Sequence, residues 1–193
     1  RALAFATGVK MANPKLHVVV FTGDGDLAAI GGNHFIHACR RNIDLTVVCM
    51  NNQIYGMTGG QGSPTTPQGC LSSTTPYGCT ETPFDLCELA TAAGANYVSR
   101  WTSYHVKELE KAVKVGLETP GFSFIEALVQ CPTAFGRRNK FRQVADHVEY
   151  LKVHSLLKAK RDRMLENGEA VPEVMFVVGE LTHRNRPAMG VKR

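Results

Sequence analysis

The chain has 193 residues, of which 44% are hydrophobic and 20% are charged, so it has the length of one ordinary domain and a globular composition. Its net charge of +5 is spread along the chain, unlike the clustered basic and aromatic residues of a nucleic-acid-binding protein. No apolar run reaches the ~18–20 residues of a membrane helix and no signal peptide is visible, so we expect a cytoplasmic protein that binds neither nucleic acid nor membrane.

Strand-like and helix-like apolar runs alternate along the chain, which predicts an α/β fold with a parallel sheet and helices on both faces. The predicted strands cover residues 16–21, 45–50, 97–101, 122–129 and 174–178, and the predicted helices cover residues 2–11, 27–41, 84–94, 104–117 and 143–166. Gly31 and Gly32 each cost the second helix about 1 kcal/mol relative to alanine, which indicates close approach of a ligand or of a neighbouring backbone. A cap at Thr102 or Ser103 is expected to open the fourth helix.

The segment 51–83 is rich in Gly, Thr, Ser and Pro and carries almost no charge. An irregular loop of about 30 residues is uncommon inside a compact domain and is usually functional. We therefore expect functional residues in this loop.

The chain opens at Arg1, without a methionine, directly in a helical pattern, and it stops at Arg193 without an evident terminal element. We expect one domain over residues 1–193, trimmed at both ends, in which residues 141–193 form a C-terminal helix and strand. Two interpretations of the charged helix 143–166 stay open: it packs on a partner, or it lies in solvent. The basic run 137–140 is likewise either a solvated loop or a contact for an anion or a partner.

None of the six cysteines belongs to a Cys-x-x-Cys pair, so the chain holds no complete zinc or cluster motif. Cys39, Cys49 and Cys87 fall within apolar patterns and are expected to be core thiols. Cys70 and Cys79 flank a polar loop and are the candidates for a disulfide, although an intracellular α/β protein favours free thiols.

Two short polar motifs stand where predicted strands end. Gly23-Asp24-Gly25-Asp26 follows the first strand, and Asn51-Asn52 follows the second. Strands joined by one helical crossover run parallel, so both motifs should meet at the carboxyl edge of the sheet, where α/β proteins bind ligands. The glycines allow the backbone to approach a phosphate, and the start of the following helix offers free N–H groups to it.

A divalent cation would explain the acidic residues at this edge. Asp24 and Asp26 alone would repel a diphosphate, whereas Asp24 and the amide oxygen of Asn52 are the hard oxygen ligands that Mg²⁺ prefers. Each motif by itself is a common turn or loop start. Together, at matching strand ends, they predict a metal–diphosphate site.

The separation of 25 residues between Gly25 and Asn51 matches the thiamine diphosphate fingerprint. The continuation over residues 52–67 closely resembles the beta subunit of 2-oxoacid:ferredoxin oxidoreductases, especially the 2-oxoglutarate class. Residues 1–8, 83–87 and 124–139 share this resemblance, which thus covers most of the chain up to about residue 140.

The resemblance implies roles for individual residues. Asp24, Asn52 and the carbonyl of Ile54 match the family's Mg²⁺ ligands. The positions that match the lining of the cofactor are Gly25, Asp26, Gly56 and Met57, with Thr58 as an added phosphate contact through its hydroxyl. His34 either faces the site from its helix or is a satisfied structural histidine.

Cys131 matches the last of four cysteines that hold a four-iron four-sulfur cluster, and the other three lie upstream of Arg1 in the family. Gly59 stands where some relatives carry a lysine. Without that cation, a second carboxylate of the substrate lacks an easy partner at this position.

The implied activity is the oxidative decarboxylation of a 2-oxo acid, 2-oxoglutarate first of all, to an acyl-CoA, with electrons passed through the cluster to ferredoxin. The glutamate that activates the cofactor is expected from a partner, the alpha subunit. No catalytic residue is therefore assigned in this chain, and Glu81, Glu88 and Glu126 fit surface or packing roles. The alternatives are a fragment of a non-oxidative thiamine diphosphate decarboxylase or synthase, a flavodoxin-like binding module, and a structural interface loop.

Overall fold

The computed structural model describes residues 1–141, 143–172 and 176–189. Its strands are β1 (Val19–Gly23), β2 (Thr46–Asn51), β3 (Ile54–Tyr55), β4 (Gln61–Gly62), β5 (Tyr97–Thr102), β6 (Ser123–Leu128), β7 (Ser155–Leu157) and β8 (Phe176–His183). Its helices are α1 (Ala2–Ala12), α2 (Asp24–Ala28), α3 (Gly32–Arg41), α4 (Leu86–Ala93), α5 (Val106–Glu118), the π-helical turn η1 (Pro132–Gly136), α6 (Val144–Val153) and α7 (Lys158–Glu166).

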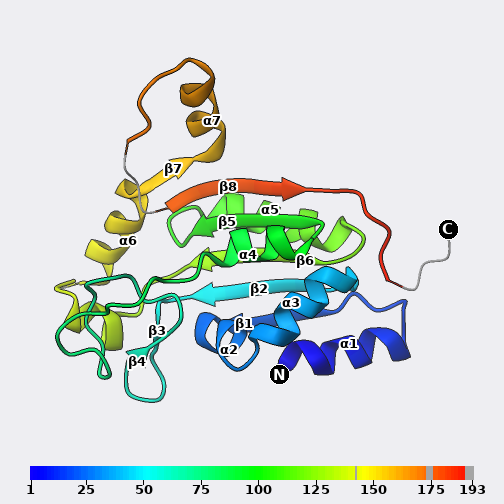
Figure 1. Cartoon of the computed structure of the whole chain (residues 1–193), viewed down its shortest axis with the longest axis horizontal. Helices are drawn as coiled ribbons and strands as arrows, with labels where there is room; N and C mark the ends of the chain where they lie inside the picture. The colour runs from blue at the N-terminus through cyan, green and yellow to red at the C-terminus, as the bar shows by residue number, and fades with distance from the viewer. Residues whose placement is uncertain (142, 173–175, 190–193) are drawn as a thin grey trace.

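Six strands form one sheet in the order β1-β2-β6-β5-β8-β7 (Figure 1). The first four run parallel to one another, which confirms the predicted parallel α/β sheet. The edge differs from the prediction, because β8 pairs antiparallel with β5, and the short β7 then pairs parallel with β8. Of the last predicted strand, residues 174 and 175 lie outside the described residues, and the strand continues well past 178 to His183.

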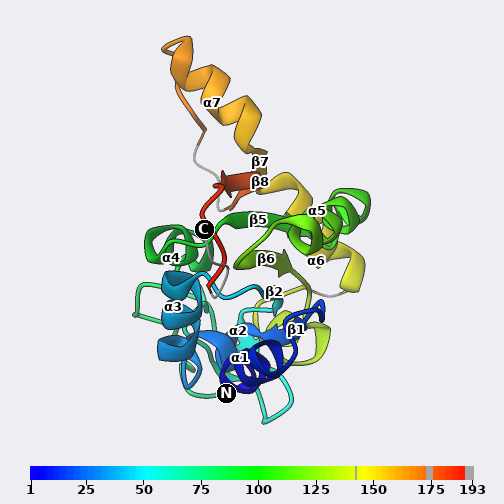
Figure 2. The ribbon, with the colours of Figure 1, turned by 90° about the vertical axis from the view of Figure 1, so that its right-hand side faces the viewer.

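Helices cover both faces of the sheet: α3 and α4 lie on one side and α5 on the other (Figure 2). On the first face, Phe35 of α3 packs its ring 4.9 Å from that of Phe124 in β6. On the second, Ala112 of α5 packs with Val48 and Ile125 of the sheet. No helix among the described residues has the length and apolar character needed to cross a membrane.

The predicted single helix over 27–41 is wrong, because the chain breaks it into α2 and α3 around residues 29–31. The Gly31 N–H donates to the carbonyl of Asp26 at 3.0 Å. A Cβ at Gly31 would lie 2.4 Å from that same carbonyl oxygen, so the close approach expected here is made by the backbone. A Cβ at Gly32 would meet nothing within 4 Å.

The predicted single helix over 143–166 is also wrong. The helix α6 begins as expected, with Gln143 as its N-cap, but it ends at Val153. Residues 155–157 then form the strand β7, which pairs with β8. The helix resumes as α7, which has no buried residue and projects from the body of the protein (Figure 2). Edge pairing with a distant strand here outweighs the local helical preference.

The cap predicted for the fourth helix is wrong as well. The N-cap of α5 is His105, which makes no capping bond through its side chain. Thr102 instead accepts the Tyr104 N–H at 3.2 Å in the turn before the helix.

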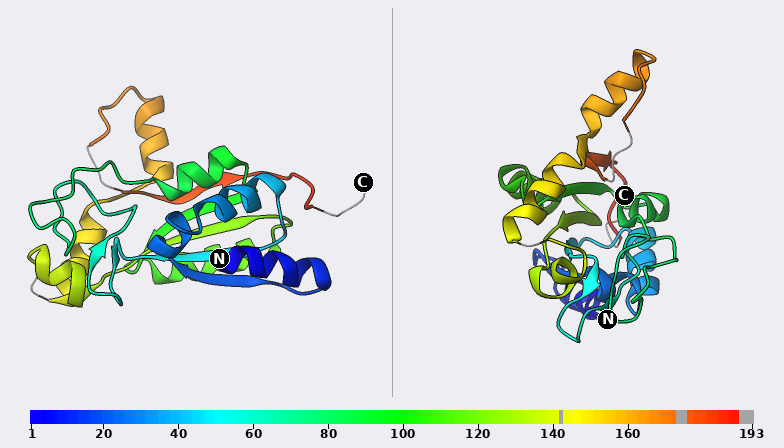
Figure 3. Two further views of the ribbon diagram at one scale, coloured as in Figure 1. Left: turned by 60° about the horizontal axis from the view of Figure 1, so that its bottom comes forward. Right: turned by 90° about the vertical axis from the view of Figure 1, so that its left-hand side faces the viewer.

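The carboxyl ends of β1 and β2 lie side by side, with Gly23 opposite Met50. The long loop after β2, the β3–β4 hairpin and η1 gather beyond this edge (Figures 1 and 3). All six cysteines lie in described segments and are free thiols. The edge predicted to bind a ligand is therefore the one that carries the irregular loop.

Candidate cofactor site

Asp24 is the buried acid at this edge. It begins α2 directly after β1 and is only 2% exposed. Ser63 and Thr65, both from the long loop, donate hydroxyl hydrogen bonds of 2.6 Å to its Oδ2, and the Asn52 N–H lies 3.3 Å from its Oδ1. Burial raises the pKa of the Asp24 carboxyl, and the two hydroxyl bonds only partly oppose this rise. A nearby cation would stabilise the charged carboxylate.

The segment after β2 turns sharply beside Asp24. Gln53 has a φ of +63°, a left-handed conformation that is uncommon for a non-glycine residue and that often marks a functional site. Its N–H donates to the Asn51 Oδ1 at 3.0 Å, and the Ile54 N–H donates to the Asn52 Oδ1 at 3.2 Å. The turn thus holds the backbone of Asn52 beside the buried Asp24 carboxylate, and it carries the Asn52 amide and the Ile54 carbonyl.

These three groups are the oxygen donors predicted for Mg²⁺, and their chemistry fits that ion. Phosphate oxygens and water complete such a site, so few acidic side chains are needed. In keeping with this, residues 1–141, 143–172 and 176–189 contain no group of three His, Cys, Asp or Glu side chains able to hold a metal.

Gly25 and Gly56 both lie in close contact with side chains of this chain. A Cβ at Gly25 would lie 2.4 Å from ring carbons of Tyr55, whose hydroxyl donates to the Gly25 carbonyl at 3.0 Å. A Cβ at Gly56 would lie 3.3 Å from the Sγ of Cys131. The predicted cluster ligand therefore lies against the predicted cofactor loop.

The tip of the β3–β4 hairpin is open to solvent. Met57 is fully exposed there, and the Thr58 hydroxyl donates to the Gln61 side chain at 2.7 Å within the loop. Gly59 has a φ of +119°, which a lysine would adopt only with strain.

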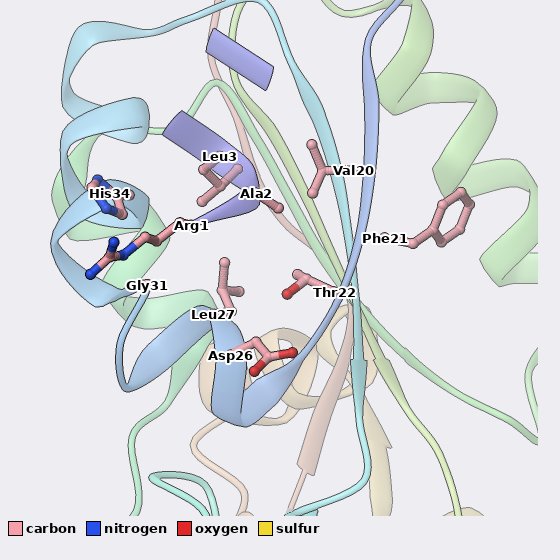
Figure 4. A pocket seen from close by; sticks show the side chains of 10 residues that line it. All are labelled: Arg1, Ala2, Leu3, Val20, Phe21, Thr22, Asp26, Leu27, Gly31 and His34. Atoms are coloured by element: carbon pink, nitrogen blue, oxygen red, sulfur yellow. The ribbon is translucent and has the colours of Figure 1, made fainter. Parts of the chain in front are cut away.

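Asp26 and His34 line a separate pocket of about 330 Å³ between α1, β1 and α3. Figure 4 shows Asp26 at the end near the strand terminus and His34 beside Arg1 at the other. The structure thus brings His34 into one pocket with Asp26, whereas Asp24 is buried and does not line this pocket.

A buried chain of polar residues behind Asp24 was missed by the sequence analysis. Asn51 Nδ2 donates to Glu126 Oε1 at 2.7 Å, and Arg100 Nε donates to Glu126 Oε2 at 2.5 Å. Arg100 also donates through Nη2 to Asp85 at 2.7 Å. Burial alone would raise the pKa of Asp85, but the charge and hydrogen bond of Arg100 hold it below its ordinary value. The signal available in the sequence for this ion pair was the opposite charge of Arg100 and Glu126, each within an apolar strand pattern.

Comparison with known proteins shows to which family the chain belongs. The family described as thiamine pyrophosphate enzyme, C-terminal TPP binding domain, matches residues 1–127. The 2-oxoglutarate synthase subunit KorB of Methanocaldococcus jannaschii is 56% identical over 97% of this chain and 68% of its own length. The chain belongs to the beta-subunit family of the 2-oxoacid:ferredoxin oxidoreductases.

Further members of this family are also similar to the chain. KorB of Methanothermobacter thermautotrophicus is 56% identical over 98% of the chain and 65% of its own length. A solved 2-oxoglutarate:ferredoxin oxidoreductase from Magnetococcus marinus is 32% identical with a TM-score of 0.81, and covers 98% of this chain and 64% of that one. The chain thus spans about two thirds of the length of the relatives it matches. The predicted family and its fold are confirmed, whereas the roles of single residues stay predictions.

Proposed function

We propose that this chain forms the thiamine diphosphate- and Mg²⁺-binding part of an enzyme that oxidatively decarboxylates a 2-oxo acid to an acyl-CoA and passes the electrons to ferredoxin. The observation that carries the proposal is the buried Asp24, held beside Asn52 at the sheet edge by the loop that resembles this family. The solved relative has 2-oxoglutarate, coenzyme A and succinyl-CoA bound, which supports 2-oxoglutarate as the substrate here. The KorB relatives favour this function over a non-oxidative decarboxylase or a flavodoxin-like module.

Asp24, Asn52 and the Ile54 carbonyl would hold the Mg²⁺ of this site. When bound, thiamine diphosphate supplies the stabilisation of the carbanion that decarboxylation generates. The residues proposed to line the cofactor are Gly25, Asp26, Gly56, Met57 and Thr58, with His34 facing the adjoining pocket. What these residues contribute is binding and orientation.

Cys131 would be one ligand of a four-iron four-sulfur cluster in the intact protein. It is buried, and its Sγ lies against Gly56 of the cofactor loop. That contact supports a short path for electrons between the cofactor and the cluster.

The glutamate that activates the cofactor would come from the alpha subunit. In this chain Glu126 is engaged with Arg100 inside the protein, and Glu81 and Glu88 are exposed. Glu126 is thus packed inside the protein and Glu81 and Glu88 lie at its surface, and we assign no catalytic residue in this chain.

The test is an anaerobic assay of the full-length protein with its alpha subunit, following ferredoxin reduction with 2-oxoglutarate and coenzyme A. We expect reduction that needs both compounds and is faster with 2-oxoglutarate than with pyruvate. A complex that binds thiamine diphosphate but contains no iron, or that releases carbon dioxide without reducing ferredoxin, would refute the oxidoreductase assignment.

A further inference from the structure

The two halves of the proposed metal site belong to segments far apart in the chain. Asp24 follows β1, and the Asn52–Ile54 turn follows β2. Their relative position has to be fixed before a cation binds, because Mg²⁺ demands near-ideal octahedral geometry. The side chain of Asn51 lies between the two halves.

The Asn51 Oδ1 faces both of them. It accepts the Gln53 N–H at 3.0 Å, which holds the left-handed turn that carries Asn52 and Ile54. It also lies 3.0 Å from the Thr65 hydroxyl, which in turn lies 2.6 Å from the Asp24 Oδ2. The Thr65 hydroxyl has a single hydrogen, which either Asn51 Oδ1 or Asp24 Oδ2 can accept at one time, so the position of the amide oxygen affects the bond to Asp24 as well as the turn.

Glu126 determines which way this amide points. A carboxylate only accepts hydrogen bonds, so the bond of 2.7 Å to Glu126 Oε1 requires the nitrogen of Asn51 on that side. Its oxygen must then face Gln53 and Thr65. An amide in place of Glu126 would both donate and accept, so of these two contacts only the Gln53 N–H would still fix the orientation of the Asn51 amide.

Glu126 is itself held rigidly. Arg100 stands directly opposite it on β5 and bonds its other oxygen at 2.5 Å, and the Cys87 thiol lies 3.3 Å from the same oxygen. Glu126 is 2% exposed and Arg100 is 7% exposed. Asp85 accepts a hydrogen bond from Nη2 of Arg100, whereas Asn51 donates to Glu126.

We propose that Asn51, oriented by the buried Glu126–Arg100 pair and acting on Asp24 through Thr65, is the positioning residue that sets the metal affinity of the site. The inference rests on the proposed function, since it assumes that Asp24 and Asn52 bind the metal. It gives the Ser-Pro-Thr-Thr part of the loop a role, because the hydroxyls of Ser63 and Thr65 hold the Oδ2 of Asp24.

The test measures Mn²⁺, as a paramagnetic substitute for Mg²⁺, by electron paramagnetic resonance in the full-length complex with thiamine diphosphate. Glu126→Gln should weaken Mn²⁺ binding by about tenfold or more, as loss of an outer-shell partner does, and should broaden the spectrum of the bound ion. The matched control is Asp85→Asn, which removes a carboxylate from the same arginine but leaves the Asn51–Glu126 bond intact. It should bind Mn²⁺ as the wild type does.

A second pair of variants covers the case in which Glu126→Gln fails to fold. Thr65→Val removes the hydroxyl on Asp24, and Thr46→Val removes an equally buried hydroxyl that bonds Gly116 instead. Only Thr65→Val should weaken Mn²⁺ binding.

Equal Mn²⁺ affinity in wild type, Glu126→Gln and Thr65→Val would overturn the inference, as would equal losses in the variants and their controls. A wild-type complex that binds no Mn²⁺ with thiamine diphosphate would overturn the proposed function itself.

Discussion

Replacing Gly25 with alanine is expected to destabilise the protein because of Tyr55. The new Cβ would lie 2.4 Å from two ring carbons, whereas ordinary contacts begin at 3.4 Å, so the ring must move by about 1 Å. Such overpacking costs about 1–3 kcal/mol, and the displaced Tyr55 hydroxyl loses its bond to the Gly25 carbonyl, worth about 1 kcal/mol. The gain from alanine in a helix returns at most about 1 kcal/mol.

The net expected loss of unfolding free energy is therefore about 1–3 kcal/mol, or a fall in Tm of roughly 3–9 °C for a chain of this size. Thermal unfolding of the cofactor-free, full-length protein, followed by circular dichroism, measures it. Gly32→Ala is the control, because its Cβ would meet nothing within 4 Å in the first turn of α3, and its Tm should stay level or rise.

A double-mutant cycle isolates the contact. In a Tyr55→Ala background the ring atoms nearest to the added methyl group are absent, so Gly25→Ala should lower the unfolding free energy much less there than in the wild type. The reasoning is refuted if Gly25→Ala is as benign as Gly32→Ala, or if its cost is the same with and without the Tyr55 ring.

Three further predictions concern charge and the cluster. Burial raises the pKa of Asp24, so the charged carboxylate destabilises the metal-free fold at pH values above the ordinary carboxyl pKa of about 3.9. Asp24→Asn should therefore raise the Tm of the metal-free protein at pH 7, and the difference in Tm from the wild type should vanish near pH 4. The pKa of Asp85 is raised by burial but brought below its ordinary value by Arg100, so this pair stabilises the fold above pH ~4 and less as the pH falls further. Asp85→Asn should accordingly lower Tm at pH 7 and converge with the wild type in acid, and parallel Tm curves would contradict the assignment. Cys131→Ala should abolish the iron content and visible absorbance of the anaerobically purified protein, whereas Cys39→Ala, on the buried face of α3, should retain both.

The sheet edge that carries the site was predictable because it follows from connectivity. Two strands joined by a crossover must run parallel, so Asp24 and Asn52 had to meet once β1 and β2 were recognised. The phosphate contact expected for the glycines stays a prediction. The side chain that requires glycine at position 25 is Tyr55, a residue from the hairpin that only the folded loop brings there.

Several contacts that the sequence did not predict have a common physical cause, because each joins residues that are distant in the sequence. Ser63 and Thr65 reach Asp24 from 39 and 41 positions away, through an irregular loop without periodicity. Residues 155–157 continue a helical pattern and become a strand only because β8 offers an edge. In the same way, the pairing of Arg100 with Glu126 depends on β5 lying beside β6.

The break between α2 and α3 had a visible signal that was interpreted only in part. Gly31 and Gly32 indicated a close approach, and the approach is real at Gly31, where the Asp26 carbonyl fills the space of a side chain. The apolar period continued through the break, so the sequence pattern suggested one helix. The consequence is that α2 is only five residues long, which leaves Asp24 anchored by loop hydroxyls as much as by its helix.

The most direct test of the site is calorimetric titration of thiamine diphosphate into the full-length protein with its alpha subunit, with and without Mg²⁺. We expect binding by the wild type only when Mg²⁺ is present, and its loss in Asp24→Ala, because that carboxylate is the one charged oxygen ligand offered to the metal. Binding of the cofactor that survives Asp24→Ala unchanged would contradict the assignment of Asp24, and with it the site built at the ends of β1 and β2.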